Sequence, residues 1–599
     1  MEERYYPASV TMEKAGENRL LVHNENDNSN HIIPQLLGTI LLQLAGSLTI
    51  EEHIESIRSN AIGIGLSKSL LYDIAKEWVS HGLLRSENLI MAGSKKSSSN
   101  KAPFFSGCIT CNRPKMIDRW LNTRTLSQSY SSNKINILIS DDSRDKKIIE
   151  NNKLIAEKHS NGYSGKIKLI NRVHRENYSN LLHIASNKKI SKDIIDFAIN
   201  INTPNYNAAT MGSNQNSLIL GSAGSILLSN DDDIEYKAYS LRDNKEKEVV
   251  FCDNYVSPVF FYPNMEQLDF NTQELGNYNL PEICRDFLNS SLNKYLATPD
   301  ALSIISPKTA ILLEKELIGI LAVVGGYRGA RWHQKSYRSI VEPQHNMEQY
   351  FYNFDDYSSI KKNGINFTAS EKTIFNNGSF FMGGTYCIDN SNILPPVFPI
   401  GTFNDSIFGV LFNRCLGPAF SVLLPVAFFH NPEIKKEFSE NDFNDVSMGI
   451  GNYCFILANK FTESFVTKDS KGRLQETGYR FEELGKLSLA DFEEYLKLIQ
   501  LEYISQMMNH IDAIKEFYSE GPAWWQEDMI KCYTLLKDEA EKKDTVVPVE
   551  LRSLNNKEKA LSLFQEYLKK YGILLQLWPD IWELSRQLNI EGKGLFGTV

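Results

Sequence analysis

The sequence predicts an α/β protein with a mostly parallel sheet, on two observations. First, short apolar runs alternate with helical patterns between residues 104 and 262, with the apolar runs at 135–139, 167–170 and 224–228. A parallel strand pair needs a crossover, usually a helix, so this alternation is typical of parallel sheets. Second, polar or acidic residues follow three of the strands, at the edge where such sheets bind ligands.

Composition and charge exclude several classes of protein. The chain has 599 residues, 42% of them hydrophobic and 23% charged, which indicates several folded domains. Its net charge of −9 gives no overall basic surface, so we expect no nucleic-acid partner. No apolar run approaches the roughly 20 residues that span a bilayer, and the first residues do not resemble a signal peptide. We therefore expect no transmembrane segment and a cytoplasmic location, with the eight cysteines reduced.

Shifts in composition divide the chain into five segments. These are an N-terminal module (1–91), a polar linker (92–103), the alternating segment (104–262), a less regular segment (263–440) and a helical C-terminal domain (441–599). In the C-terminal domain, Ser488 with Asp491 three residues later predicts a helix start. The helices of this domain offer surfaces for a homodimer.

The N-terminal module has the pattern of a small winged-helix unit. Thr49 and Glu52 form a capping box at the start of one predicted helix, and a second runs from Ser67 to a C-cap at Gly82. This order of elements resembles the PqqD-like fold, which binds leader peptides by adding a strand to a sheet edge. The alternative is a docking or packing module. DNA binding is disfavoured because acidic residues balance the lysines of the second helix.

Asp231, Asp232 and Asp233 follow the strand at 224–228 and are the sharpest chemical feature. Three adjacent carboxylates repel one another, and a divalent cation would cancel that cost. Mn²⁺ or Mg²⁺ suits oxygen ligands and commonly combines carboxylates with phosphate oxygens. Since side chains alternate along a strand, Asp231 and Asp233 can point the same way. The alternative is a solvated acidic turn.

Further motifs occur with this cluster in a recognisable order. Thr110-Cys-Asn112-Arg113 follows the first strand, Asp141-Asp142-Ser143 follows the second, and Asn216 and Gly224 precede the acidic cluster. This order resembles the family 2 type glycosyltransferases of the GT-A fold. The resemblance implies a Rossmann-like GT-A domain, with a nucleotide-sugar-binding half at 104–262 and an acceptor-side half at 263–440. Gln215 departs from the family, which usually has Arg there.

The resemblance also implies roles for individual residues. Asp141 would accept from the base or ribose with Asp142 in support, Asp231 would contact the ribose or sugar and bind metal, and Asp233 would hold the metal. The implied donor-binding set is Thr110, Asn112, Arg113, Asp141, Asp142, Asn216 and Asp231.

The distal segment supplies an implied base and a third metal ligand. Asn404-Asp405 matches the acidic pair at which inverting members place the catalytic base, which takes the acceptor's proton. His430 ends an apolar strand, where the family often places a metal ligand. Gly383 and Gly384 resemble the glycine pair on the acceptor side. The alternatives are a helix N-cap for Asp405 and a satisfied core or surface histidine for His430.

These features favour a metal-dependent, inverting glycosyltransferase that uses a nucleotide sugar. The N-terminal module suggests a peptide acceptor, and a surface glycan or small molecule is the alternative. A non-catalytic scaffold on a degenerate GT-A fold is a further alternative. A nucleotidyltransferase is disfavoured, because it would need a glycine-rich loop after the first strand and this chain has Cys-Asn-Arg-Pro there. Residues 325–332 are interpreted as a loop whose arginines, Arg328 and Arg331, either meet an anion or lie on the surface.

Overall fold

The computed structural model describes most of the chain. The described residues are 3–60, 65–92, 102–128, 135–203, 209–242, 248–253, 255, 257–276, 278–298, 300–315, 319–329, 353–377, 384–417, 419–433, 437, 439, 446–517, 521–542 and 546–596. Gly383, Arg331 and most of the predicted linker lie outside these ranges.

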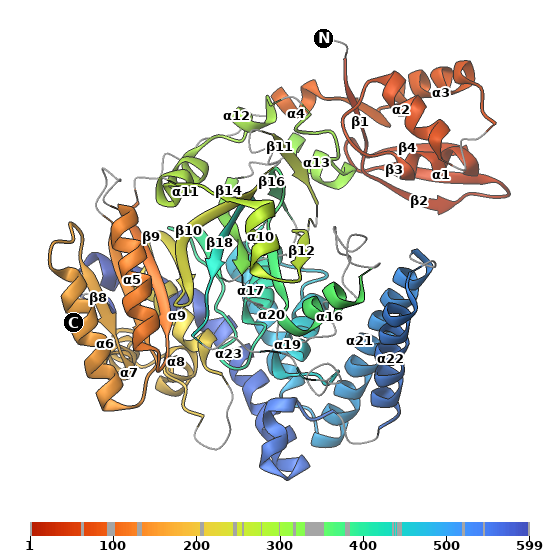
Figure 1. The fold of residues 1–599 in the computed structure, drawn as a ribbon. Coiled ribbons are helices and arrows are strands. Elements are labelled where there is room, and N and C mark those ends of the chain that lie inside the picture. The colour runs from red at the N-terminus through yellow and green to blue at the C-terminus, as the bar shows by residue number, and fades with distance from the viewer. Residues whose placement is uncertain are drawn as a thin grey trace.

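The N-terminal module folds around its own core and projects from the body (Figure 1). An antiparallel sheet of β2 (Val10–Lys14), β3 (Arg19–Asn24) and β4 (Ser29–Pro34) packs against α1 (Gln35–Gln43), α2 (Ile50–Ser59) and α3 (Lys68–Ser80). β1 (Tyr5–Pro7) pairs with β5 (Leu84–Ser86), and α4 (Asn88–Ala92) follows. The predicted helix signals are confirmed: Thr49 and Glu52 form the capping box of α2, Ser67 caps α3, and Gly82 has a φ of 70°.

One large mixed sheet forms the body. Its main path, in spatial order, is β11 (Val249–Cys252), β16 (Thr373–Asn376), β18 (Ala419–His430), β14 (Gly319–Gly329), β17 (Thr385–Asn390), β9 (Ser225–Asp231), β6 (Phe104–Thr110), β7 (Asn136–Asp141) and β8 (Ile167–Ile170). Four further strands attach to this path: β10 (Ile234–Leu241), β12 (Val259–Tyr262), β13 (Thr272–Glu274) and β15 (Ile365–Thr368).

The parallel arrangement predicted for the first half of the body is confirmed. β6 pairs in parallel with both β7 and β9, and β7 pairs in parallel with β8. β17 departs from this pattern because it runs antiparallel to its neighbours β9 and β14. β14 is parallel to β18. Consequently β17 begins at the edge where β9, β14 and β18 end.

Helices cover the sheet. They are α5 (Pro114–Gln128), α6 (Lys146–Ser160), α7 (Arg172–Ala185), α8 (Lys192–Ile199), α9 (Met211–Gly221), α10 (Met265–Asn271), α11 (Leu280–Asn289), α12 (Asn293–Leu296), α13 (Pro307–Lys315), α16 (Phe354–Asn363), α17 (Asn404–Cys415), α19 (Ile450–Phe461), α20 (Ser470–Leu484), α21 (Leu489–Phe517), α22 (Ala523–Glu541), the 3₁₀ helix η1 (Val549–Leu554) and α23 (Lys557–Ile590). In the described part of the chain, no helix is both long and apolar enough to cross a membrane.

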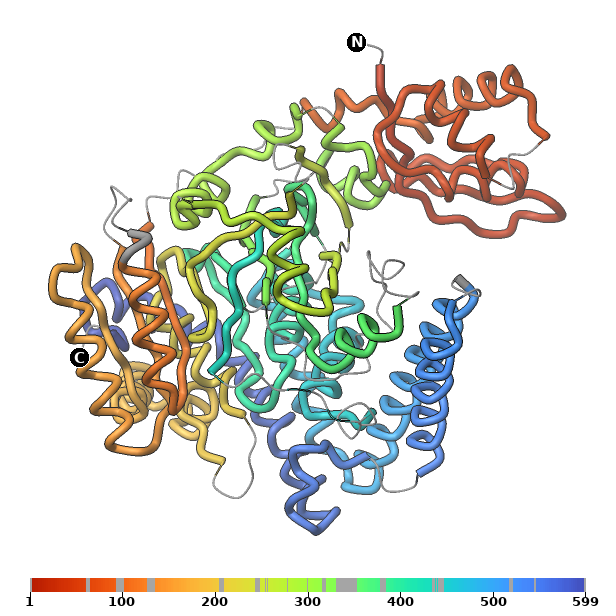
Figure 2. Tube along the Cα trace, viewed as in Figure 1, coloured from red at the N-terminus to blue at the C-terminus, as the bar shows by residue number. Residues whose placement is uncertain are grey.

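The C-terminal helix α23 is packed into the same core as the sheet (Figure 2). The indole nitrogens of Trp578 and Trp582 donate to the carbonyl of Leu394 and to Oδ1 of Asn390, at 2.5 and 2.9 Å. Both indoles are buried, so each needs such a partner. α21 and α22 form a hairpin around a smaller core that also includes Tyr357 of α16 and Val446.

The interpretation of residues 325–332 as a loop is wrong for its described part. Gly325–Gly329 lies inside β14, and Arg328 is buried rather than on the surface. Its guanidinium pairs with Asp269, donates to Thr272 and stacks over the Tyr239 ring at 4.0 Å. These contacts all lie within the fold, so Arg328 is a packing residue of β14.

Candidate active site

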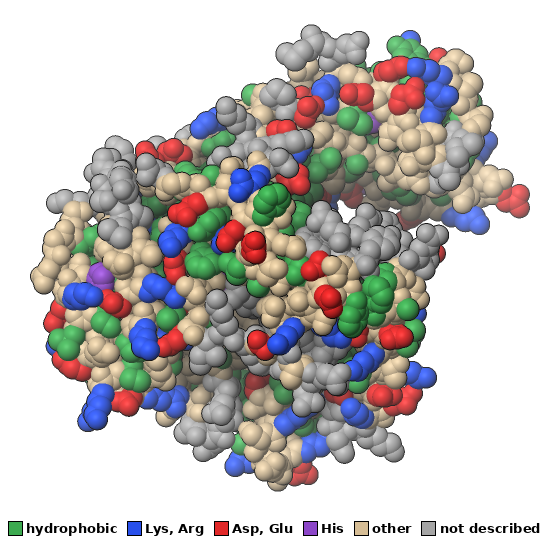
Figure 3. Space-filling view, in the orientation of Figure 1, with side chains coloured by type: hydrophobic (Ala, Val, Ile, Leu, Met, Phe, Trp, Pro, Cys, Tyr) green, Lys and Arg blue, Asp and Glu red, His purple; other side chains and the backbone are tan. Residues whose placement is uncertain are grey.

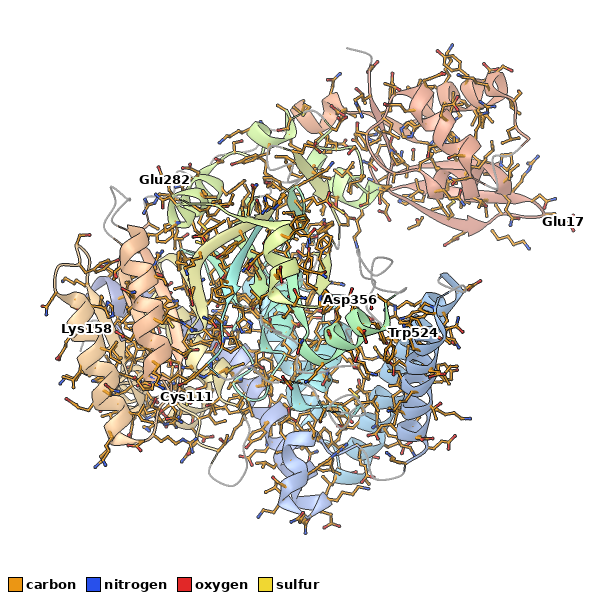
Figure 4. The ribbon with its side chains drawn as sticks, viewed as in Figure 1. Glu17, Cys111, Lys158, Glu282, Asp356 and Trp524 are labelled. Atoms are coloured by element: carbon orange, nitrogen blue, oxygen red, sulfur yellow. The ribbon has the colours of Figure 1, made fainter. Side chains whose placement is uncertain are left out.

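Predicted metal-binding, donor-binding and acceptor-side residues meet at one edge of the body sheet. Asp231 ends β9, His430 ends β18, and Gly384 immediately precedes β17. The edge continues to Thr110, the last residue of β6, and to Cys111 beyond it, which Figure 4 labels. The antiparallel insertion of β17 therefore places residues from both halves of the body side by side.

Asp232 is the structural member of the acidic cluster. It is buried, and its two oxygens accept hydrogen bonds from Thr110 Oγ1 at 2.7 Å and from Arg113 Nη1 at 2.9 Å. Burial and the charge of Asp233 raise the pKa of Asp232 to about 6, against the opposing effect of Arg113. Asp232 thereby ties β9 to the loop after β6.

Asp233 lies between a guanidinium and an imidazole. Arg113 Nη1 is 3.1 Å from Oδ2 of Asp233, and His430 Nε2 is 3.6 Å from Oδ1. Burial alone would raise the pKa of Asp233, but His430 and Arg113 outweigh it and the pKa is lowered. The backbone amide of Asn431 also donates to the carbonyl of Asp233 at 2.9 Å, which fixes the end of β18 beside the acidic cluster.

Asp231 has the opposite electrostatic environment. Burial and the negative charges of Asp233 and Asp232 raise its pKa well above the usual range, and Asp405 adds to this effect. The positive charge that favours its ionised form most is that of His430. A cation bound at this edge would stabilise the ionised form of Asp231.

Asp405 lies in the first turn of α17, where the helix dipole favours a negative charge. The amide of Ser406 donates to its Oδ1 at 2.9 Å. The preceding backbone is strained, because Phe403 adopts a φ of 72°, in the left-handed region. This loop is held against α19, since a Cβ on Gly451 would lie only 1.8 Å from the carbonyl oxygen of Thr402. The negative charge of Asp405 contributes to raising the pKa of Asp231, Tyr327 and Tyr386, so Asp405 lies near these three residues.

Asp141 and Asp142 are both buried and hydrogen-bonded to protein groups. Asp141 accepts from the amide of Ser143 and from Asn152 Nδ2, each at 2.9 Å. Asp142 accepts from Arg172 and Arg175, both at 2.6 Å, and from Thr210. The two carboxylates thus fix the end of β7.

The remaining predicted residues occupy different surroundings. Asn112 is exposed with a φ of 59°, and its amide donates to Ser143 Oγ at 2.8 Å. Asn216 is buried within α9, where its side-chain amide bonds the backbone of Ala198 and Val397. Gln215, the departure from the family pattern, donates from Nε2 to Tyr386 Oη at 2.7 Å.

Sequence reasoning missed several residues of this edge. Tyr327 and Tyr386 are buried beside the carboxylates of Asp231 and Asp405. Arg172 and Arg175 pair with Asp142. A usable signal existed for the arginines, because they directly follow the predicted strand at 167–170. None existed for the tyrosines, because their position depends on the pairing of β14 with β17.

The chemistry of these side chains fits a divalent metal ion. Asp233 offers a carboxylate and His430 an imidazole nitrogen, both ligands of Mn²⁺, with Asp231 beside them. Within the described residues, no group of three or more such side chains already converges as a ligand set. The protein would therefore supply few ligands, as is usual where substrate phosphates and waters complete the coordination of Mg²⁺.

A separate cavity of about 860 Å³ lies between α7, α8 and α23. It contains no predicted site residue. Arg172 lines it and also bonds Asp142, so its wall adjoins the end of β7. Figure 3 shows charges of both signs interspersed over the visible face of the molecule.

Comparisons with known proteins include a distant structural likeness. The sequence matches no family model and no curated protein. Among solved structures, the chain is similar to the mannosyltransferase PcManGT from Pyrobaculum calidifontis, in complex with GDP-Man and Mn²⁺. The two share 11% identity at a TM-score of 0.25, over 91% of this chain and 99% of that one. At this TM-score the likeness decides neither fold nor activity.

Proposed function

We propose that this chain is a metal-dependent glycosyltransferase of the GT-A type that transfers a sugar from a nucleotide donor with inversion. The observation that carries the proposal is the pairing of Asp233 with both His430 and Arg113 at one sheet edge, with Asp231 and Asp405 near it. These groups combine two metal-type donors, a cation for a diphosphate and a carboxylate base. The order of motifs along the chain supports the same function.

The groups at the ends of β6 and β9 would bind the nucleotide-sugar donor. Arg113 is half exposed although it contacts both Asp232 and Asp233, so its guanidinium can also reach diphosphate oxygens. Asp233 and His430 would hold Mn²⁺ or Mg²⁺, with Asp231 toward the ribose or sugar. The bound ion would neutralise the charge that develops on the leaving nucleoside diphosphate.

Transfer requires a base because an acceptor hydroxyl is a poor nucleophile. Asp405 would take the proton as the acceptor oxygen forms a bond to the anomeric carbon. The bond from that carbon to the diphosphate oxygen breaks at the same time, and its electron pair leaves with the nucleoside diphosphate. General-base catalysis of this kind contributes about 10²–10⁴-fold in rate.

We propose a peptide as the acceptor, held by the N-terminal module. β4 is an edge strand of its sheet, and within the described residues its outer side pairs with no other strand. The side chain of Ile32 on β4 is 63% exposed, which suits an added peptide strand. The competing proposal is a glycan or small-molecule acceptor that bypasses the module.

The substitution Ile32→Asp distinguishes a peptide acceptor from a glycan or small-molecule acceptor. It should weaken peptide binding and raise KM for a leader-bearing peptide at least tenfold, while donor hydrolysis is unchanged. Val466→Asp is the matched control, since Val466 is 90% exposed and lies before α20. Equal peptide kinetics in both variants would favour the glycan or small-molecule acceptor.

The first experiment tests the donor site itself. Thermal unfolding is measured with UDP-, GDP- and dTDP-sugars, with and without Mn²⁺, for the wild type and Asp233→Ala. A ligand at 100 times its Kd stabilises the folded state by about 2.7 kcal/mol, which is a measurable shift. A Mn²⁺-dependent shift that the variant loses supports the proposal. The absence of any shift would favour a non-catalytic scaffold.

A further inference from the structure

Tyr327 occupies the centre of the candidate active site. Four neighbouring strands, β18, β14, β17 and β9, contribute in turn His430, Tyr327, the preceding Gly384, and Asp231. Tyr327 therefore stands between the two sides of the proposed metal site. Its side chain is buried, with 7% exposure.

The ring of Tyr327 fixes the imidazole of His430. The two ring centroids are 5.8 Å apart and the planes meet at 80°, an edge-to-face contact. Nε2 of the same imidazole faces Asp233 Oδ1 at 3.6 Å. The ring contact with Tyr327 and this polar contact together limit rotation of the imidazole, so its Nε2 stays directed at the acidic cluster.

The hydroxyl of Tyr327 contacts the other side of the site through Gly384. A Cβ on Gly384 would lie 1.9 Å from Oη, so only glycine fits against the phenol. The amide of Gly384 donates to Oη, and its carbonyl accepts from the amide of Asp231 at 3.2 Å. One glycine thus connects the Tyr327 phenol to the backbone of Asp231.

We propose that Tyr327 is the positioning residue that preorganises the metal site, its ring holding His430 and its hydroxyl holding the Gly384–Asp231 backbone. This inference rests on the proposed function and extends it to a residue outside the implied motifs. Groups that orient metal ligands typically change metal affinity or activity by about 10–100-fold when mutated.

The test compares Mn²⁺ binding by Tyr327→Leu and Tyr327→Phe. Electron paramagnetic resonance detects the bound Mn²⁺, in the presence of the nucleoside diphosphate that the wild type binds. Tyr327→Leu removes both contacts and should weaken Mn²⁺ binding about tenfold or more. Tyr327→Phe keeps the ring, so Mn²⁺ affinity should stay within about twofold while kcat falls about tenfold. Tyr357→Phe is the matched control, because Tyr357 is a buried tyrosine that bonds Asp528 outside the site at 2.7 Å.

The outcomes separate this inference from the proposed function. If wild type binds no Mn²⁺ with any nucleoside diphosphate, the proposed function fails. If wild type binds it and Tyr327→Leu binds it equally, the positioning role fails alone. Should Tyr327→Leu not fold, the Phe variant decides: a kcat equal to that of Tyr357→Phe overturns the role of the hydroxyl.

Discussion

Nε2 of His430 lies 3.6 Å from Oδ1 of Asp233, although the two residues belong to different halves of the body. β10 and β18 bring them together, because Ile234 pairs with His430 in the antiparallel register of these strands. The same contact lowers the pKa of Asp233 against the effect of burial. The most direct prediction concerns this pair.

His430→Ala should weaken Mn²⁺ binding by at least about 10–100-fold, the loss found when a metal site loses a group that only orders a ligand. The reason is that the imidazole nitrogen is one of the few proposed protein ligands, and without it Asp233 faces Arg113, which repels a cation. The measurement is Mn²⁺ titration in the presence of nucleoside diphosphate. His159→Ala is the control, since His159 pairs with Asp118 on α5 at 2.8 Å, away from the acidic cluster. Equal loss in both variants would contradict the assignment.

Asp405→Asn should lower kcat by about 10²–10⁴-fold and leave the donor-induced thermal shift intact. An amide keeps the shape of the side chain but cannot accept the acceptor's proton. The measurement is steady-state transfer alongside thermal unfolding with the donor. Asp355→Asn controls for the loss of a first-turn carboxylate, because Asp355 holds that position in α16. Loss of donor binding in Asp405→Asn would instead indicate a structural cap.

Local patterns were sufficient to predict the parallel half of the body. The strands at 135–139 and 167–170 and the helix between them are specified by neighbouring residues, and the structure has β7, α6 and β8 there. The capping box at Thr49 is equally local, since its two hydrogen bonds span three residues. Such features depend on short sequence distances and are visible in one sequence.

Long-range pairing explains what the sequence did not reveal. The antiparallel insertion of β17 depends on its match to β9 and β14, and no local pattern encodes that choice. The loop interpretation of residues 325–332 was wrong because glycines suggested a turn, whereas Gly326 serves close packing: a Cβ there would lie 1.5 Å from the carbonyl of Thr368. Because residues 325–332 were assigned to a loop, Tyr327 was also not predicted as a residue of the site.

Gly384→Ala should destabilise the protein by about 1–3 kcal/mol, the usual cost of overpacking. Its new Cβ would lie 1.9 Å from Tyr327 Oη, and the ring of Tyr327 is confined by His430. Denaturant unfolding measures the change. Gly319→Ala, at the start of β14, is the control because a Cβ there meets nothing within 4 Å. Equal stability of the two variants would show that the Tyr327 ring can move away.

The N-terminal module should dock on the body in a pH-dependent way through Glu314 of α13. This carboxylate accepts from Tyr6 Oη at 2.7 Å, Asn26 Nδ2 at 2.9 Å and Arg85 Nε at 3.1 Å, all from the module. Burial raises the pKa of Glu314, but these hydrogen bonds outweigh it and the pKa is lowered. The ionised carboxylate therefore favours docking at neutral pH.

The sign of the effect follows from that depressed pKa. The contribution of Glu314 to docking is fully present above the pKa of the carboxyl in the undocked state, about 4.3 for Glu. This contribution is lost as the pH falls through the lower pKa that Glu314 has in the docked state. At pH 7, Glu314→Gln should weaken docking by about 1.5–3 kcal/mol, the contribution of a charged hydrogen bond. Hydrogen exchange in β1 and α13 would then rise, while Glu282→Gln, whose carboxylate bonds only within α11's own N-cap, leaves it unchanged. Exchange that is identical in wild type and Glu314→Gln would mean that the Gly46 and Ser47 amides, which donate to Ile305 and Leu302, hold the module without Glu314.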